Sequence, residues 1–213
     1  MRTVIFANGE FNHPEKVRDL IQTEDYLIAA DGGLKHVHTL GLSPNLVIGD
    51  MDSLGSLETS LIATTPVETI RFPAEKDETD LELAVAEAVK RGGNPILITG
   101  ALGGRLDLTI ANLMLLSHPN LDGVNISIVD GTQEVFVIRE YGQVNGAAGD
   151  GVSLLALNGP ALGVCTAGLQ YPLQDEALNP EQARGVSNVM LGEQAEIWVR
   201  QGGLLCIHTR KNQ

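Results

Sequence analysis

Residues 79–104 read TDLELAVAEAVKRGGNPILITGALGG and contain, in order, the signals of a helix, a strand and a glycine-rich loop. Thr79 and Glu82 form the capping box that begins many helices. The apolar residues that follow share one helical face: Leu81, Ala84, Val85, Ala88 and Val89. We therefore predict a helix that starts after Thr79, has Asp80 in its first turn and ends before Gly92.

The same alternation of strand and helix runs through the first 130 or so residues. Short β-branched segments alternate with longer helical patterns, which is typical of βαβ units around a parallel sheet. The predicted strands are residues 3–7, 26–30, 45–48, 67–70, 95–99 and 125–129, with a further strand at 132–138. We expect an α/β domain over residues 1–141, with a mostly parallel Rossmann-like sheet and flanking helices.

A stretch rich in glycine and small residues, 142–151, predicts a domain boundary. Short strand-like segments follow it, separated by turn residues: 152–157, 163–169, 185–191, 195–200 and 204–209. This pattern predicts an all-β sandwich or roll over residues 142–213. A core of this size is marginal in isolation, so we expect it to pack on the first domain or on a second chain.

The composition is strongly acidic: 27 Asp and Glu against 14 Lys and Arg give a formal net charge of −13. That charge repels nucleic-acid phosphates and anionic membranes, and no cluster of basic residues offsets it. No apolar run approaches the roughly 18 residues that a membrane span needs. Cys165 and Cys206 have neither zinc-site spacing nor the density of a secreted scaffold. We expect a cytoplasmic protein that has free thiols and binds neither nucleic acid nor membranes.

Four polar segments follow predicted strands, at the sheet edge where open α/β folds gather their ligands. They are residues 31–33, 49–53, 76–80 and 100–107. In the first, Gly32 and Gly33 would let the backbone approach a phosphate at a helix N-terminus. Asp31 could bind a ribose or a metal-bound water, and a plain turn with Asp31 as a helix cap is equally compatible with the sequence.

The second and third segments concentrate carboxylates. Asp50 and Asp52 repel each other unless a cation lies near, and their hard oxygen ligands suit magnesium. Residues 50–80 hold eight acids against two bases. A shared divalent-cation site explains this concentration better than an acidic loop or acids that complement a helix dipole, although both alternatives remain open.

The fourth segment combines glycines with an arginine. Gly100, Gly103 and Gly104 would expose backbone N–H groups, and Arg105 has the planar fork that pairs with phosphate oxygens. Arg105 could instead pair with Asp107 or Asp77. Carboxylates for magnesium, a glycine loop and one arginine are the components of phosphoryl or pyrophosphoryl transfer.

Five ordered motifs resemble those of thiamine pyrophosphokinases. They are Asp-Gly-Gly at 31–33, Gly-Asp-Met-Asp-Ser-Leu at 49–54, Lys-Asp-x-Thr-Asp at 76–80, Gly-Ala-Leu-Gly-Gly-Arg-x-Asp at 100–107 and Gly-x-Ser-Asn at 185–188. The resemblance spans both predicted domains. It implies transfer of pyrophosphate from ATP to the hydroxyethyl oxygen of thiamine, giving thiamine diphosphate and AMP. It also implies a homodimer with the active site between subunits.

The resemblance implies roles for individual residues. Magnesium ligands would be Asp50, Asp52 and Asp80, and the catalytic set would be Asp52, Asp77, Asp80 and Arg105. ATP would face Asp31, Gly32, Gly33, Gly100, Gly103, Gly104 and Arg105. Substrate binding would involve Lys76, Asp107, Ser187 and Asn188, the last two contacting thiamine. The general base stays open between Asp80 and Asp77.

Two departures from the family pattern limit this transfer of roles. Leu108 replaces a common His, so no His relay can act there. Cys206 stands in the stretch where animal members carry a Trp that stacks on thiamine. The cover of the thiamine rings is therefore open, with Trp198, Tyr171 or a residue of the partner chain as candidates.

Three other functions compete with this interpretation. A related pyrophosphokinase would act on another alcohol, such as a hydroxymethyl pterin. A metal phosphohydrolase is disfavoured because Gly49 separates Asp50 from its strand and Ser53-Leu54 replaces the expected Gly-Thr. A non-catalytic nucleotide-binding module would have little use for four clustered aspartates at repelling spacing.

Overall fold

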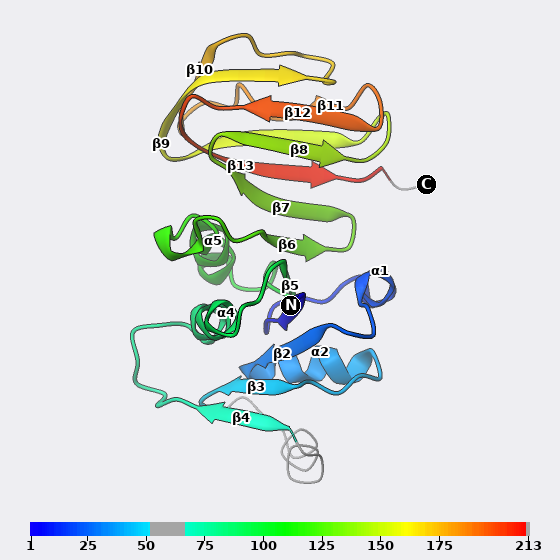
Figure 1. Cartoon of the computed structure of the whole chain (residues 1–213), viewed down its shortest axis with the longest axis vertical. Helices are drawn as coiled ribbons and strands as arrows, with labels where there is room; N and C mark the ends of the chain where they lie inside the picture. Colours follow the sequence, from blue (N-terminus) through cyan, green and yellow to red (C-terminus); the bar gives the residue numbers. More distant parts are fainter. Residues whose placement is uncertain (52–66, 212–213) are drawn as a thin grey trace. The chain divides into compact units, whose positions relative to one another are not determined.

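The computed structural model describes residues 1–51 and 67–211 and divides into two compact units, Met1–Gly131 and Thr132–Gln213 (Figure 1). Each unit buries a hydrophobic cluster of its own. The boundary predicted between residues 141 and 142 falls inside the second unit. The reason is that β7 (Gln133–Ile138) pairs along its whole length with β13 (Gln201–Thr209).

The described strands of the first unit form a parallel sheet. They are β1 (Thr3–Phe6), β2 (Tyr26–Ala30), β3 (Leu46–Gly49), β4 (Glu68–Arg71), β5 (Ile96–Thr99) and β6 (Ile126–Asp130). Their order is β4-β3-β2-β1-β5-β6, and all neighbouring pairs are parallel. The predicted parallel α/β sheet is thus confirmed. Its order matches a Rossmann sheet only in part, because the fourth strand lies at the outer edge instead of beside the first.

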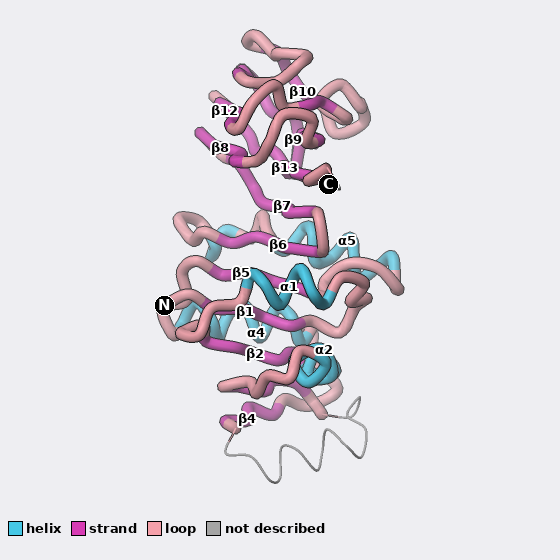
Figure 2. The backbone as a smooth tube through the Cα atoms, turned by 90° about the vertical axis from the view of Figure 1, so that its right-hand side faces the viewer, coloured by secondary structure: helices cyan, strands magenta, loops and turns pink. Residues whose placement is uncertain are grey.

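Helices cover this sheet (Figure 2). They are α1 (Pro14–Leu20), α2 (Leu34–Thr39), α4 (Asp80–Lys90) and α5 (Leu106–Leu115), with short 3₁₀ turns η1 (Asp31–Gly33) and η2 (Pro119–Leu121). Val17 of α1 and Val37 of α2 share a buried cluster with Val4 and Phe6 of β1. Helix α4 packs against β1, β2 and β3. No helix among the described residues is long and apolar enough to cross a membrane.

The capping box predicted for α4 is present. Glu82 N–H donates to Thr79 Oγ1 at 3.2 Å, and Thr79 N–H donates to Glu82 Oε2 at 2.7 Å. The predicted apolar face is buried at Leu81, Ala84, Val85 and Ala88, while Val89 is half-buried. This cap places Asp80 as the first residue of the helix, next to the carboxyl end of β3.

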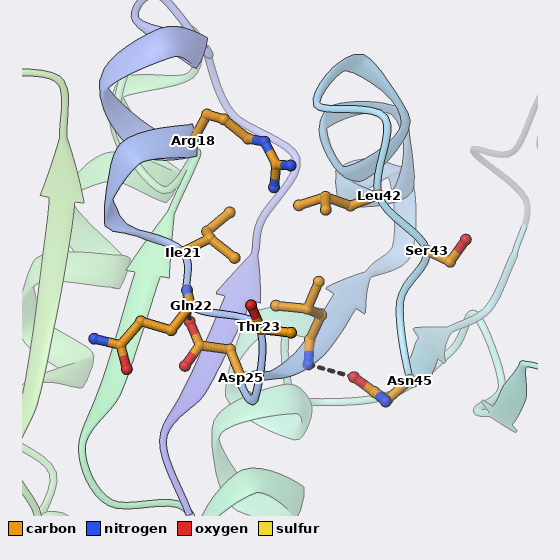
Figure 3. A pocket seen from close by; sticks show the side chains of 9 residues that line it. Arg18, Ile21, Gln22, Thr23, Asp25, Leu42, Ser43 and Asn45 are labelled. Carbon is orange, nitrogen blue, oxygen red and sulfur yellow. Dashed lines mark hydrogen bonds between the residues drawn. The ribbon is translucent and has the colours of Figure 1, made fainter.

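The two edges of the parallel sheet differ in what their polar groups do. The edge at the amino ends of the strands holds a cavity of about 430 Å³ beside Arg18 and Asn45 (Figure 3). There Asn45 Oδ1 accepts the Leu27 N–H at 2.7 Å, and Asp25 is bound to Arg2 at 2.7 Å. Both contacts link neighbouring segments of the first unit to one another. At the opposite edge lie the segments that contain the candidate site residues selected from the sequence.

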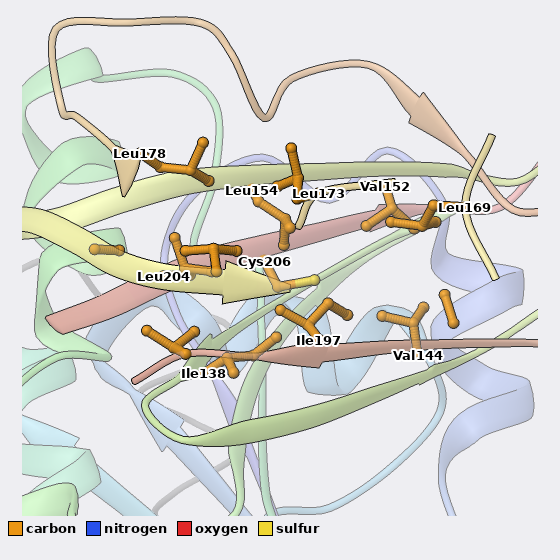
Figure 4. Close-up of a cluster of buried hydrophobic side chains, with 14 of the residues drawn as sticks. Ile138, Val144, Val152, Leu154, Leu169, Leu173, Leu178, Ile197, Leu204 and Cys206 are labelled. Carbon is orange, nitrogen blue, oxygen red and sulfur yellow. The ribbon is translucent and has the colours of Figure 1, made fainter. Parts of the chain in front are cut away.

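The second unit is built from strands alone among its described residues. Besides β7 and β13 they are β8 (Tyr141–Asn145), β9 (Gly151–Ala167), β10 (Glu176–Leu178), β11 (Asn188–Val189) and β12 (Gln194–Trp198). The first half of β9 pairs with β13 and its second half with β12, so residues 152–157 and 163–167 belong to one long strand instead of two, and the second predicted strand ends two residues before Leu169. Side chains from these strands enclose one hydrophobic core (Figure 4).

The glycine-rich stretch 142–151, interpreted from the sequence as a domain boundary, begins inside β8, which pairs with β12. Gly142 is needed there for close packing, because a Cβ at that position would lie 2.6 Å from Ile138 Cδ1. Glycine is common at domain boundaries, but Gly142 marks a point of close packing inside the second unit.

The two thiols differ in exposure. Cys206 is fully buried in the core of the second unit, and burial raises the pKa of its thiol to about 12. Cys165 is half-buried, and its Sγ accepts the Asp175 N–H at 3.2 Å. The hydrophobic core of the second unit encloses the Cys206 side chain.

We expect Cys165 alone to react with a thiol reagent in the native protein at pH 8, because only about one Cys206 in ten thousand would be a thiolate. The measurement is the number of thiols titrated before and after unfolding in guanidinium. C165S, the control, should show no rapid reaction. Two rapidly reacting thiols in the folded wild type would contradict the burial of Cys206.

Candidate active site

A cavity of about 630 Å³ lies at the carboxyl ends of the strands of the first unit. Its lining includes seven of the residues that sequence analysis selected: Asp31, Asp50, Lys76, Asp80, Gly103, Gly104 and Arg105. Asp31 follows β2, Asp50 follows β3 and Asp80 begins α4. Three separate segments of the chain therefore bring their carboxylates to one place, as expected for the edge of a parallel sheet.

Gly49 allows two of these carboxylates to approach. Its φ is +150°, and a Cβ on it would lie 3.0 Å from Asp31 Cβ and 3.2 Å from Asp80 Oδ1. Asp31 itself has a positive φ of 46°, which is rare for a residue other than glycine. Among the described residues, no hydrogen-bond partner reaches the buried Asp31 Oδ1. Strain and an unsatisfied oxygen together favour a role for Asp31 beyond capping.

Lys76 holds the acidic cluster together in the free protein. Its Nζ lies 2.9 Å from Asp80 Oδ1 and 3.9 Å from Asp50 Oδ2. Burial alone would lower the pKa of Lys76, but the hydrogen bond to Asp80 and the charges of Asp80, Asp50 and Asp31 outweigh it and raise that pKa above its usual value. A charged ammonium thus lies where these carboxylates meet.

The donor set fits a hard cation such as magnesium only in part. Within residues 1–51 and 67–211, no three Asp, Glu, His or Cys side chains are arranged to hold a metal together. Asp52, the remaining one of the three predicted magnesium ligands, lies outside the described residues. The unsatisfied Asp31 oxygen, with Asp50 and Asp80 lining the same cavity, supplies oxygen ligands of the required type.

The glycine loop after β5 lies against the segment that follows β1. Gly9 N–H donates to the Gly100 carbonyl at 2.6 Å, and Ala7 N–H donates to the Thr99 carbonyl at 2.8 Å. Gly100 has a φ of +65°, and a Cβ there would lie 2.7 Å from the Ala7 carbonyl oxygen. Gly100 is therefore required by the contact between the two loops, and it does not line the cavity.

His36 and the glycines of η1 pack against the segment that follows β1. His36 Nε2 lies 3.0 Å from the Gly9 carbonyl, and burial lowers the pKa of His36, which favours the neutral ring as donor. A Cβ on Gly32 would lie 2.5 Å from the Asn8 amide, and one on Gly33 would overlap the Phe6 carbonyl. Gly32 and Gly33 are not among the lining residues, so packing alone explains them in the free protein.

Arg105 lies at the cavity and is paired with Asp107. The guanidinium Nη2 is 2.5 Å from Asp107 Oδ2, and Nε is 3.2 Å from Oδ1. Both side chains are largely exposed, at 71% and 65%. Sequence analysis considered Asp107 and Asp77 as partners of Arg105, and in the structure Arg105 pairs with Asp107. Water and dissolved salt screen an ion pair this exposed, so an incoming phosphate can replace it.

Other predicted site residues do not line this cavity. Asp77 is absent from its lining, as is Asp107. Ser187 and Asn188 belong to the second unit. The Asn188 amide is engaged with Tyr171, accepting its N–H at 3.0 Å and donating to its carbonyl at 2.7 Å.

Three polar lining residues lie outside the four segments selected from the sequence: Asn8, Glu10 and Asn112. Asn8 and Glu10 follow β1 directly, so the rule that selected the other segments applies to them as well. Asn112 is in α5, where its Nδ2 donates to the Ala101 carbonyl at 2.7 Å and holds the glycine loop. A single Asn inside an apolar helical pattern gave no signal of that contact.

Known proteins resemble both units. A family model described as the catalytic domain of thiamin pyrophosphokinase matches residues 17–128, and one described as its vitamin B1 binding domain matches residues 136–204. A thiamine pyrophosphokinase of Bacillus subtilis (strain 168) is 24% identical over 212 residues, covering 98% of this chain and 99% of the relative. One of Oryza sativa subsp. japonica is 23% identical over 168 residues, covering 72% of this chain and 62% of the relative.

Solved structures show the same fold. The Bacillus subtilis thiamine pyrophosphokinase superposes with a TM-score of 0.90 at 22% identity, with 100% of each chain covered. A thiamin pyrophosphokinase family protein of Enterococcus faecalis gives 0.84 at 26% identity, again over 100% of both chains. Because the two family models together span most of the sequence, this chain belongs to the thiamin pyrophosphokinase family.

Proposed function

We propose that the cavity of the first unit performs the reaction of the family, in which pyrophosphate passes from ATP to thiamine and gives thiamine diphosphate. The observation that carries this assignment is the convergence of Asp31, Asp50 and Asp80 around Lys76, beside the loop that ends at Arg105. Such a site positions a polyphosphate and balances its charge, which is most of what this transfer requires of a protein.

Magnesium, held by Asp50 and Asp80 with the predicted ligand Asp52, would supply positive charge against the phosphates of ATP. Asp31 offers its unsatisfied oxygen to the same cation or to the ribose. Gly103 and Gly104 of the glycine loop would face the phosphates. Arg105 would leave Asp107 to bind a phosphate oxygen, because the guanidinium fork fits either anion.

The chemical step forms a bond between the hydroxyethyl oxygen of thiamine and the β-phosphorus, and it breaks the bond from that phosphorus to the oxygen that leaves with AMP. The hydroxyl proton passes to a carboxylate. Of the two candidates, Asp80 lines the cavity and Asp77 does not, which favours Asp80 as the acceptor.

Thiamine binding is proposed for the second unit, where Ser187 and Asn188 lie within the match to the vitamin B1 binding domain. Asn188 would act by fixing the backbone at Tyr171, whose side chain is 55% exposed. The working enzyme would be a cytoplasmic homodimer with its active site between subunits. Helix α5 supports this assembly, since it has no buried residue and exposes Leu106, Ile110 and Met114.

We expect the purified protein to release AMP from ATP when magnesium and thiamine are both present. Thin-layer or mass-spectrometric detection of AMP and thiamine diphosphate is the measurement. AMP formed with a hydroxymethyl pterin but not with thiamine would favour the related pyrophosphokinase. Tight ATP binding without turnover would favour the nucleotide-binding module, and inorganic phosphate released without an acceptor would indicate a hydrolase.

D80N should lower kcat by about a hundredfold, because it removes a charged oxygen from the proposed metal and proton-acceptor site. Folding should be retained, because Asn has nearly the shape of Asp and the capping box of Thr79 and Glu82 stays intact. The measurement is kcat across a magnesium titration, with Tm as a folding check. D19N, which removes a carboxylate from exposed α1, is the matched control. Wild-type kcat in D80N would remove Asp80 from the site.

I110E should convert the proposed dimer to a monomer, because a charge would replace an apolar side chain that is 49% exposed on α5. Light scattering coupled to gel filtration gives the mass. L20E, at a 37% exposed leucine of α1, is the control. A wild-type monomer, or an I110E protein that remains dimeric, would contradict this interface.

A further inference from the structure

Glu10 places a carboxylate directly on the glycine loop. Its Oε1 accepts the Gly104 N–H at 3.0 Å, and a Cβ on Gly103 would lie 2.7 Å from its Oε2. Its own N–H donates to the Leu102 carbonyl at 3.0 Å, and Asn12 Nδ2 donates to Oε2 at 3.2 Å. Backbone and side chain of Glu10 are therefore both fixed against this loop.

The contact has the chemistry of an anion bound to a loop N–H. Gly103 and Gly104 have φ values of +78° and +69°, conformations in which a glycine loop can direct N–H groups at an anion. In the free protein the anion at Gly104 is a side chain of the protein itself. Since Glu10 and Gly104 both line the cavity, a polyphosphate that enters meets this carboxylate.

The net negative charge of the cavity makes the approach of a phosphate to Glu10 unfavourable. Five carboxylates line it against two cations, Lys76 and Arg105. Lys76 is engaged with Asp80 and Asp50, and Arg105 with Asp107. Both cations thus pair with carboxylates other than Glu10. Like charges at short range oppose each other, so the Glu10 carboxylate must be displaced from Gly104 or shielded when a phosphate binds.

We propose that Glu10 is a positioning residue that occupies the phosphate contact of the glycine loop in the free enzyme and thereby weakens the binding of ATP. This proposal rests on the assignment of the cavity to ATP. Glu10 keeps the loop in a conformation that binds an anion, and its carboxylate competes with the phosphate for the Gly104 N–H. The affinity for ATP is then set by a balance in which this carboxylate opposes the ligand.

The test compares E10Q and E10A with the wild type by calorimetric titration with ATP in magnesium. Gln keeps an oxygen for the Gly104 N–H but removes the charge, whereas Ala removes both. We expect E10Q to bind ATP about fivefold more tightly at low ionic strength, the effect of relieving one like-charge contact near 4 Å in water. E10A should also bind more tightly, and high salt should reduce the gain for both.

Two controls separate local charge from global charge and from loop shape. E15Q removes a carboxylate that is 67% exposed on α1 and should leave the Kd for ATP unchanged. Adenosine carries no phosphate, so its Kd should not respond to E10Q. An unchanged Kd for ATP in E10Q together with weaker binding in E10A would mean that Glu10 only supports the loop, and would overturn the proposal.

A second readout needs neither ATP nor turnover. The Gly104 amide resonance should move upfield in E10A, because its hydrogen bond to a carboxylate is lost, and an unmoved resonance would overturn the proposal. The proposed function fails by a different result, a wild type that binds ATP but forms no AMP with thiamine. Tighter ATP binding by E10Q would stand in that case.

Discussion

Electrostatic repulsion between carboxylates at one edge of a parallel sheet is the constraint on which the first unit depends. Asp31, Asp50 and Asp80 arrive there from three segments because the strand ends converge. In the free protein the Lys76 ammonium offsets their charge, and their fields in turn keep it protonated. A cation at this point lowers the repulsion among the carboxylates, which couples the stability of the site to the charge of what it binds.

Absent side chains are as important to this edge as the carboxylates. Gly49 leaves room between Asp31 and Asp80, Gly100 lets two loops touch, and Gly33 passes under the Phe6 carbonyl. From the sequence, Gly32, Gly33 and Gly100 were predicted to face ATP. In the structure they first serve to bring backbone segments together, and only Gly103 and Gly104 among the glycines of the predicted ATP set line the cavity.

Local patterns predicted the first unit well because its elements are specified locally. The strand at residues 26–30 is confirmed to the residue, and the Thr79 capping box is present with both hydrogen bonds. Asp31, Asp50 and Asp80 could be selected because each directly follows a strand or begins a helix. Their meeting at Lys76, and the contact of Glu10 with Gly104, depend on segments distant in sequence. No periodicity or spacing contains such pairings.

The second unit was predicted less well for a related reason. Turn residues such as Asn158, Gly159 and Pro160 normally separate strands, yet here they lie within β9. Asn158 and Gly159 take positive φ values of 60° and 137°, so the chain changes direction while its pairing continues from β13 to β12. Tertiary pairing overrides the local signal at that point.

One consequence of β9 concerns how the second unit opens. A single strand pairs with β13, β12, β10 and β11, each through its own set of residues on β9. Loss of β9 would therefore break all four pairings at once, so we expect the unit to unfold as one cooperative block. A surface built on such a block keeps its shape between turnovers, and adjustments to a ligand fall to the loops that connect the strands.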